Sequence, residues 1–163
     1  MLKELGEYKN NLRSIFANDD KICRLLLGEN FESMDFNFDN EFDKYVVQHL
    51  FIANTIMDTK SYIMFESYVS STYGSTKTMK VIIQTICHKD IVKYDEKPDG
   101  YPGLRYDVLA QYIEELLCPP DKQKRNDIIK KFGIGSFELM GVDIFQTEKY
   151  IGRILTFTVP DFR

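Results

Sequence analysis

The sequence contains no tryptophan, two histidines and three cysteines among its 163 residues. The cysteines, Cys23, Cys87 and Cys118, are widely spaced and form no CxxC pair, which excludes a zinc ribbon and a thioredoxin-type motif. An odd number of separated cysteines also gives no support to a disulfide framework. We therefore expect free thiols and a protein that stays in a reducing compartment.

Long apolar runs and an excess of basic residues are missing as well. No run approaches the roughly 20 apolar residues that cross a bilayer, and the first residues, MLKELGEYKNNL, lack the apolar core of a signal peptide. The net charge is −4 at pH 7, so a bulk attraction to nucleic-acid phosphates is not expected, and DKQKR with IIKK is the one basic stretch. These absences predict a protein without a membrane partner, kept in the cytoplasm or assembled there into something larger.

The hydrophobic pattern that is present predicts a single α+β domain over residues 1–163. Residues 1–28 have apolar side chains at helical spacing and are expected to form N-terminal helices. The NDD at Asn18 to Asp20 can cap the second of them, which Gly28 then ends. Residues 29–59 are an acidic, aromatic connection, and residues 60–163 hold the sheet and the main helix. We expect an antiparallel or mixed β-sheet of about four strands, with the N-terminal helices and one main amphipathic helix packed on it.

The strands and helices after residue 60 follow from local patterns. The segments KSYIMFESYVS and TMKVIIQTICHKD flank the turn-like STYGST, and isoleucines on both faces of the second segment predict a central strand covered on both sides. An apolar stripe marks LRYDVLAQYIEELLC as the main helix, which two prolines end. A polar helix, DKQKRNDIIKKF, is expected to stop at Gly133. The segments SFELMGVDIF and YIGRILTFTVP then form a hairpin around QTEK.

The acidic aromatic stretch ENFESMDFNFDNEFDK permits two interpretations. It is a surface connection whose aromatic rings pack onto the body, or a docking arm that becomes ordered when a partner binds. Asp35, Asn37, Asp39 and Asp43 fit positions 1, 3, 5 and 9 of a calcium-binding EF-hand loop. However, Asn40 replaces the required glycine and Val46 replaces the bidentate glutamate, so we predict no calcium site.

The stretch ICHKDIVKYDEKPDGYPGLRYD is the one place where chemistry-bearing residues gather. Cys87 and His88 are adjacent in a strand, so their side chains point to opposite faces and do not pair as nucleophile and base. Most of the carboxylates lie beside proline and glycine, where acidic turn residues are expected in any case. We predict no enzyme activity, no catalytic residue, no metal site and no cofactor. A nuclease-type site in which His88, Asp90 and Asp95 hold a divalent ion is kept as an alternative.

The same stretch opens the main helix. Asp107 lies in its first turn, where a carboxylate offsets the helix dipole. Arg105 is expected to pair with a carboxylate of its own loop or of a neighbouring subunit. The stretch is therefore interpreted as a structural connection between a central strand and the main helix.

Short signatures over residues 60–159 resemble those of phage neck proteins, the small tail-terminator and head–tail joining proteins of tailed bacteriophages and prophages. A strand ending near CH.D precedes a helix that opens with G.R.D, and strands with GIG..EL and R.LTF complete the pattern. The matching positions are Cys87, His88, Asp90, Gly103, Arg105, Asp107, Gly133, Gly135, Glu138, Leu139, Arg153, Leu155, Thr156 and Phe157.

The resemblance implies a structural virion protein. Within this class it implies a tail terminator, a ring of identical subunits (commonly a hexamer) that caps the tail tube and meets the head-side connector. The order strand–strand–helix–strand–strand suits a terminator better than a head-closure (stopper) protein, which with another connector ring is the alternative. Outside this class, a metal-dependent nuclease and a non-virion assembly factor remain alternatives.

The implied partners are further copies of the chain, the tail tube protein and the head-side connector or stopper. Genomic DNA would pass through the lumen without specific binding, because like charge repels phosphate. The expected location is the virion neck or tail, after assembly in the host cytoplasm. Aromatic and charged residues of the connection, the main helix and the C-terminal strand are the predicted interface candidates: Phe36, Phe38, Phe42, Tyr101, Arg105, Asp107, Arg153 and Phe162.

Overall fold

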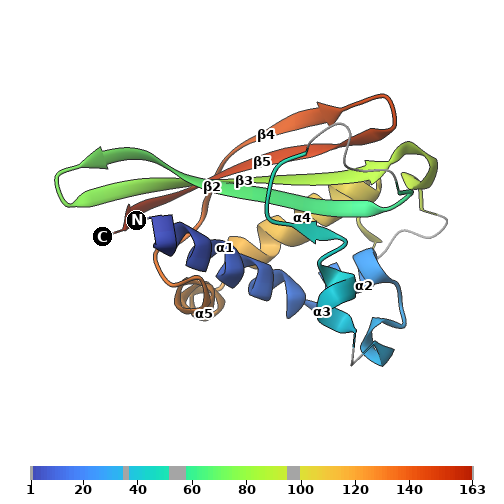
Figure 1. Ribbon diagram of the computed structural model, residues 1–163, viewed down its shortest axis with the longest axis horizontal. Helices are drawn as coiled ribbons and strands as arrows, with labels where there is room; N and C mark the ends of the chain where they lie inside the picture. Colours follow the sequence, from blue (N-terminus) through green and yellow to red (C-terminus); the bar gives the residue numbers. More distant parts are fainter. Residues whose placement is uncertain (1, 35–36, 52–57, 95–99, 163) are drawn as a thin grey trace.

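The computed structural model describes residues 2–34, 37–51, 58–94 and 100–162 of the chain. It has two layers, a twisted sheet and a set of helices that cover one face of that sheet (Figure 1). This is the predicted α+β fold. No helix in the described part of the chain is long and apolar enough to cross a membrane.

The N-terminal part of the chain forms one long helix followed by several short elements. Its elements are α1 (Leu2–Ala17), α2 (Asp20–Leu27), the 3₁₀ turn η1 (Phe31–Ser33), α3 (Phe38–Phe42) and β1 (Val46–Val47). The remaining elements are β2 (Ser61–Tyr73), β3 (Thr76–His88), the 3₁₀ turn η2 (Lys89–Ile91), α4 (Arg105–Leu117), α5 (Lys122–Phe132), β4 (Glu138–Gln146) and β5 (Tyr150–Phe162).

The sheet has the strand order β1-β2-β3-β5-β4. The two-residue strand β1 is parallel to β2, whereas all other neighbours are antiparallel, so the sheet is mixed. The hairpins β2–β3 and β4–β5 are those predicted from the sequence, and β3 lies between β2 and β5. The second hairpin joins the first through β5, which leaves β4 at the edge of the sheet.

The register places the two faces of β3 in different surroundings. Ile83 is opposite Leu155 on β5, and both side chains are buried against the helices. Ile86 is opposite Gly152, and it packs on the other face in a smaller cluster with Tyr62. The predicted two-sided cover of β3 is therefore confirmed at its C-terminal end, whereas Ile82, nearer the middle, is only half-buried on the open face.

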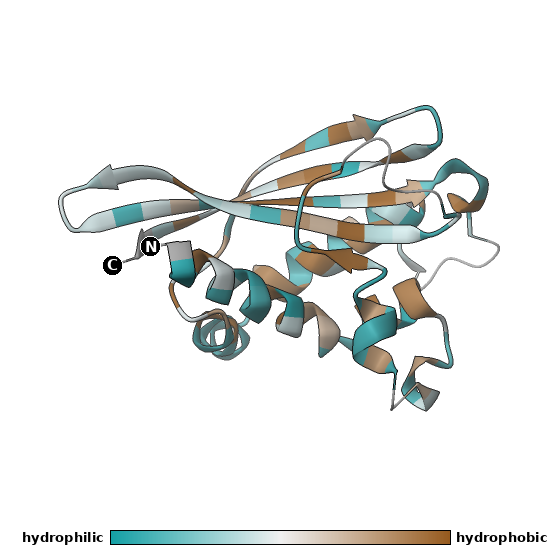
Figure 2. Cartoon of the chain, viewed as in Figure 1, coloured by the Kyte–Doolittle hydropathy of each residue, from teal (hydrophilic) through white to brown (hydrophobic). Residues whose placement is uncertain are grey.

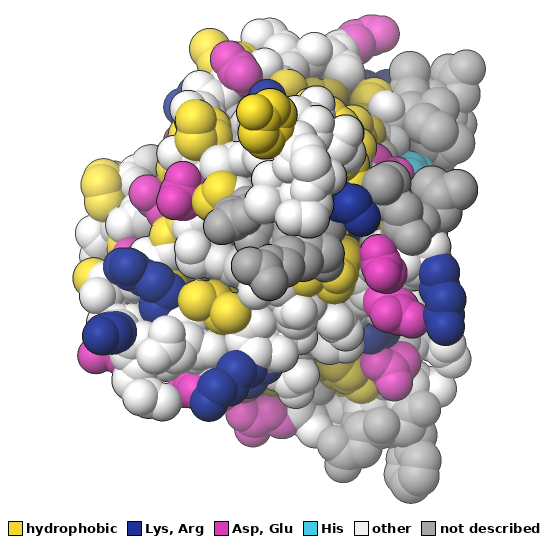
Figure 3. Space-filling view, turned by 90° about the vertical axis from the view of Figure 1, so that its left-hand side faces the viewer, with side chains coloured by type: hydrophobic (Ala, Val, Ile, Leu, Met, Phe, Trp, Pro, Cys, Tyr) yellow, Lys and Arg dark blue, Asp and Glu magenta, His cyan; other side chains and the backbone are white. Residues whose placement is uncertain are grey.

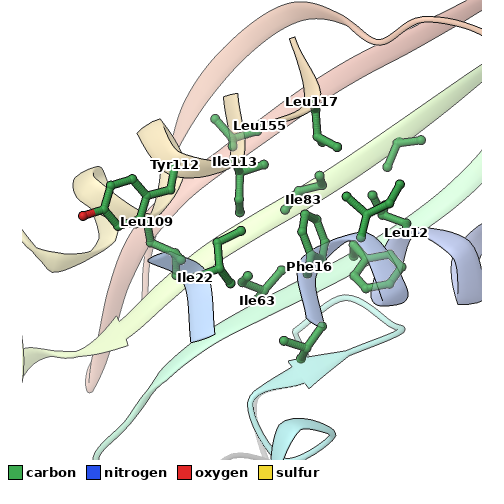
Figure 4. Close-up of a cluster of buried hydrophobic side chains, with 14 of the residues drawn as sticks. Leu12, Phe16, Ile22, Ile63, Ile83, Leu109, Tyr112, Ile113, Leu117 and Leu155 are labelled. Carbon is green, nitrogen blue, oxygen red and sulfur yellow. The ribbon is translucent and has the colours of Figure 1, made fainter. Parts of the chain in front are cut away.

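The main core lies between the sheet and the helices. In Figure 4 the side chains of Phe16, Ile22 and Ile113 point toward Ile63 and Ile83 of the sheet, and all five are fully or almost fully buried. Each buried side chain of this size contributes about 1.5–3 kcal/mol relative to an exposed one. The helices show hydrophobic residues on the side toward the sheet and hydrophilic residues outward (Figure 2), which is the amphipathic pattern seen in the sequence.

Local capping fixes where the helices begin and end. The Asp19 carboxylate accepts the Ile22 N–H at 2.9 Å, and the Asp121 carboxylate accepts the Lys124 N–H at 2.8 Å. Gly133 ends α5 with φ +103°, a conformation that glycine adopts without strain. These caps confirm the predicted start of the second helix and the predicted end of the polar helix.

The acidic aromatic connection is folded onto the body where it is described. Phe31 and Phe42 belong to the main core, and the Phe42 ring is fully buried beside Phe38, with 5.4 Å between ring centroids. Arg13 of α1 donates to Asp43 at 2.6 Å and to Asp39 at 3.0 Å, which fastens α3 to the long helix. The first interpretation of this stretch is thus correct for these rings, and the docking-arm interpretation is corrected for Phe42, whose ring has no exposed surface to offer a partner.

Replacing Phe42 with alanine is expected to lower the free energy of unfolding by about 3–5 kcal/mol, because the change opens a cavity in the core. Phe38→Ala, which removes a half-buried ring from the same helix, is the matched control and should cost clearly less. Urea unfolding followed by circular dichroism measures both. A cost below about 1 kcal/mol for Phe42→Ala would show that α3 is not part of the cooperative fold.

Candidate functional site

The end of β3 separates the two residues that a cysteine-type site would need. Cys87 faces the helices and is buried, and its Sγ lies 3.2 Å from the His88 carbonyl oxygen. Burial raises the pKa of the Cys87 thiol to about 11, so a thiolate is rare at neutral pH. His88 lies on the opposite face, where its ring packs edge-on against Tyr150 and its Nδ1 accepts the Asp90 N–H at 3.1 Å. Both side chains are held in structural contacts, as the alternation along the strand predicts.

Of the carboxylates of the alternative metal site, the structure describes Asp90 but not Asp95. Asp90 lies beside His88, with 3.5 Å between the His88 Nδ1 and the carboxylate. Within the described residues, no three His, Cys, Asp or Glu side chains are grouped closely enough to hold a metal ion. Asp95, one of the three residues of the alternative nuclease site, lies outside the described residues.

Asp107 and Arg153, two of the predicted interface candidates, are brought together in one ion pair. Asp107 Oδ2 accepts the N–H of Leu104 at 3.3 Å, while its Oδ1 accepts Nε of Arg153 on β5 at 2.8 Å. The hydrogen bond to Asp107 raises the pKa of the Arg153 guanidinium. The carboxylate thus completes the first turn of α4, where a negative charge is favourable, and ties that helix to the sheet.

Arg105 connects α4 with the loop after β3. Its Nε donates to the Ile91 carbonyl at 2.9 Å, and its guanidinium lies over the Tyr94 ring at 4.3 Å from the centroid. No carboxylate among the residues with described positions forms an ion pair with Arg105, and the acidic side chains of residues 95–99 lie outside that set. The predicted pairing of Arg105, with a carboxylate of its own loop or of a neighbouring subunit, therefore stays a prediction.

Tyr101 anchors the segment before α4. Its hydroxyl lies 2.8 Å from each carboxylate oxygen of Glu115, and its ring meets Tyr112 edge-on. The Lys21 ammonium lies over both rings, at 5.8 and 5.4 Å from their centroids. Together with Arg105 and Arg24, it lines a pocket of about 400 Å³, in which Arg24 already pairs with the Glu29 carboxylate at 3.0 Å.

A second hollow lies between α4 and the edge strand β4, and we call it the α4–β4 groove. Ala110, Cys118, Pro120, Val142 and Leu155 are its apolar lining residues, and this open groove has a volume of about 420 Å³. Polar and charged residues surround it: Asp107, Gln111, Glu114, Glu115 and Arg153. Beside it three large apolar side chains of β4 are exposed, Met140 (63 %), Val142 (51 %) and Ile144 (69 %).

The sequence predicted the strand and the helix that border this groove, but it did not predict the groove itself. The alternation in SFELMGVDIF predicts a strand, and it does so equally whether the apolar side of that strand is covered or not. Only the tertiary arrangement shows that α4 packs on β3 and β5 and leaves β4 uncovered.

The third surface is the distal half of the first hairpin, residues 68–80, which we call the β2–β3 arm. It projects beyond the helices at one end of the molecule (Figure 1). Tyr73 at its tip is 88 % exposed. Seen from this end, the molecule carries hydrophobic side chains between basic and acidic ones, without a field of one sign (Figure 3). Such a mixed surface is typical of a protein contact and not of a phosphate-binding face.

The side chains of two predicted interface candidates, Phe36 and Phe162, are not described by the structure. Phe36 falls outside the described residues, and the backbone of Phe162 ends β5 while its side chain is not described. Phe38 is half-buried on α3, beside the fully buried Phe42.

A comparison with protein families gives one match. The profile of the YomW family aligns with residues 19–159, from the N-cap of α2 to Val159 near the end of β5. The chain belongs to the YomW family. YomW is a phage gene name, so this is a phage-associated protein, as the sequence resemblance predicts. The match does not extend to a neck or tail-terminator family, and no curated protein matches the chain.

The match covers every residue that lines the pocket beside Lys21 or the α4–β4 groove of this YomW-family protein. It also covers the whole β2–β3 arm. Helix α1 lies outside the match, although Leu12 and Phe16 of that helix are buried in the main core. The folded unit is thus larger than the matched segment.

Asp107→Ala is expected to lower the free energy of unfolding of this YomW-family protein by about 1 kcal/mol. The change removes a charge-assisted hydrogen bond and a helix-start contact, and partial exposure of both partners limits the loss. Glu114→Ala, an exposed position on the same helix, should stay within about 0.5 kcal/mol. The double variant with Arg153→Ala should cost less than the sum of the single changes, and strict additivity would contradict the pairing.

The cysteines of this YomW-family protein are expected to differ in reactivity. Burial raises the pKa of Cys23 and of Cys87 to about 11, which leaves about one thiolate in a thousand at pH 8. Iodoacetamide at pH 8 should therefore modify the half-exposed Cys118 first, and the other two only after unfolding. The ordinary pKa is about 9, so the stability gained by burying these two thiols is complete below pH 9 and is lost as the pH rises to about 11. Peptide mass mapping identifies the order, and early modification of Cys87 would contradict it.

Proposed function

We propose that this phage-associated protein is a structural subunit of a tailed-phage neck, a tail terminator that forms a ring on the tail tube and joins it to the head-side connector. The observation that carries the proposal is the exposed apolar edge strand β4. Membership of a phage family and the resemblance of the strand and helix signatures to neck proteins support it.

An uncovered apolar edge strand is a feature that monomeric proteins avoid. Edges are ordinarily protected by charges, proline, bulges or a covering element, because unpaired strands invite another chain. β4 has nine residues, with a bulge between Leu139 and Gly141 and a carboxylate at Asp143, yet within the described structure no strand pairs with its outer side. Its exposed Met140, Val142 and Ile144 would be covered if a neighbouring subunit bound there. A contact between two different patches builds a ring when the rotation from one copy to the next closes, and the proposal requires such a rotation.

The proposal includes no catalysis and no cofactor. Cys87 and His88, the residues nearest to a reactive pair, are engaged in packing and backbone contacts on opposite faces of β3. The partners in the proposal are copies of the chain, the tail tube protein and the head-side connector, and the location is the virion neck after assembly in the host cytoplasm. The net charge of −4 supports passage of genomic DNA without specific binding.

A nonsense mutation in the gene, introduced into the phage or prophage that encodes it, tests the proposal. A ring that ends growth of the tail tube predicts overlong tails that are not attached to heads, visible by negative-stain electron microscopy. Immunogold labelling of wild-type particles is expected at the head–tail junction. Expression of the wild-type gene in trans is the control and should restore joined particles of normal tail length.

Other outcomes overturn the proposal at different levels. Normal tails beside heads that have lost their DNA would replace the terminator by a stopper. Finished particles without label, from cells that make the protein, would remove it from the virion. Loss of DNA processing, together with normal tails and heads, would point to the alternative nuclease.

A further inference from the structure

We propose that the β2–β3 arm of one copy binds in the α4–β4 groove of the next copy and so links the chains head to tail. This inference rests on the proposed ring, and it names the contact that would build it. The arm and the groove are different surfaces on different elements, so each copy offers both, and the contact repeats from one copy to the next.

The tip of the arm presents one large aromatic ring, that of Tyr73, at the end of the paired strands. Tyr73 is directly opposite Thr76 in the antiparallel ladder, and the Thr76 hydroxyl donates to the Tyr73 carbonyl at 2.8 Å. Gly74 has φ +60°, which allows the tight turn between the strands. A tyrosine that is 88 % exposed contributes nothing to the fold's own core. Tyrosine is, however, among the residues that contribute most at the centres of protein interfaces.

The groove offers an apolar floor of the right orientation. Val142 is opposite Leu155, and Ile144 is opposite Arg153. Directly opposed residues of antiparallel strands share a face, so Val142 and Ile144 lie on the same side as α4. This side of β4 is open because α4 is seated over β3 and β5. A tyrosine ring lying there would cover apolar surface of both β4 and α4.

The charges of the two surfaces are complementary. The arm contains Lys77 and Lys80 and no acidic residue. The groove is surrounded by three carboxylates, of Asp107, Glu114 and Glu115, and by one guanidinium, of Arg153, which already pairs with Asp107. The groove therefore keeps a net negative charge that suits Lys77, which is one position along the ladder from Tyr73, whereas Lys80 lies further back, opposite Tyr68. Charge complementarity of this kind fixes orientation and speeds encounter.

Cross-linking tests the contact directly on the purified full chain and on lysates of phage-producing cells. Ser75→Cys places a thiol beside Tyr73 at the tip, and the native Cys118 lies in the groove. A flexible bismaleimide should then give a ladder of dimers, trimers and larger species on denaturing gels. Ser75→Cys combined with Cys118→Ser should lose every species above the dimer, because only arm-to-groove links continue from copy to copy. Dimers alone, or no products in both preparations at any concentration, would overturn the inference.

A charge exchange gives a second, independent test in the same assay. Lys77→Glu or Glu114→Lys alone should reduce the ladder at least 10-fold, and the two changes together should restore it to within about 3-fold, since the pair is attractive again. Tyr73→Ala should also abolish the ladder. Tyr68→Ala is the matched control, because Tyr68 is an exposed tyrosine of the same arm that is opposite Lys80 on the open face of the sheet. Equal loss for Tyr68→Ala and Tyr73→Ala would contradict binding of the tip.

The outcomes separate this contact from the proposed function. A ladder from a protein that is absent from finished particles would keep the contact and remove the neck assignment. Label at the neck without a ladder would keep the assignment and replace the contact. Urea unfolding of each variant confirms that a lost ladder does not reflect a lost fold.

Discussion

The pairing of β3 with β5 beneath α4 is the contact on which the rest of this structure depends. It joins two segments that lie about half the chain apart, with Ile83 directly opposite Leu155. Ile113 of α4 packs over this pair and is itself fully buried. Because side chains alternate along a strand, a shift of one residue in this register would turn the apolar side of β5 away from the helices. The positions of both hairpins follow from the same register.

The same arrangement explains why one part of the sheet is left open. α4 is seated on the central strands through Leu109, Ile113 and Leu117, and it is held at its first turn by the pair of Asp107 with Arg153. A single helix in this place covers β3 and β5 and leaves the strand at the edge exposed. The apolar side of β4 is thus a consequence of where the core is best filled, and it is also the surface that an assembly would use.

Features with a local cause could be predicted from the sequence, and features with a distant cause could not. The caps at Asp19 and Asp121 and the turn at Gly133 are visible within a few residues, so the corresponding helix limits were correct. The sequence left open whether the Phe42 ring packs onto the body or binds a partner, because the residues around it in the fold, such as Arg13 of α1, are distant in sequence. The two-residue strand β1 is likewise too short to give a periodic signal.

The candidate site shows the same division. The turn around Arg105 and Asp107 was recognised as the start of a helix, but the partner of Asp107 lies 46 residues later on β5 and could not be identified. The uncovered side of β4 was hidden for a related reason, since a strand pattern carries no information on what lies above it. Both the Asp107–Arg153 pair and the open side of β4 depend on contacts between elements that are distant in sequence, and patterns within a single sequence do not reveal such contacts.

The ion pair between Asp107 and Arg153 connects the stability of the fold with the geometry of the groove. It fastens the first turn of α4 to β5, and both side chains also line the groove. The distance between α4 and the edge strand is therefore set within the subunit, before any neighbour arrives. Because the groove is already formed in the free subunit, little conformational entropy is lost when an arm binds. This preorganisation favours association beyond what the contacts themselves contribute. On this view the charged residues of the helix start, Arg105 and Asp107, need no catalytic role, because Asp107 affects assembly through the position of α4.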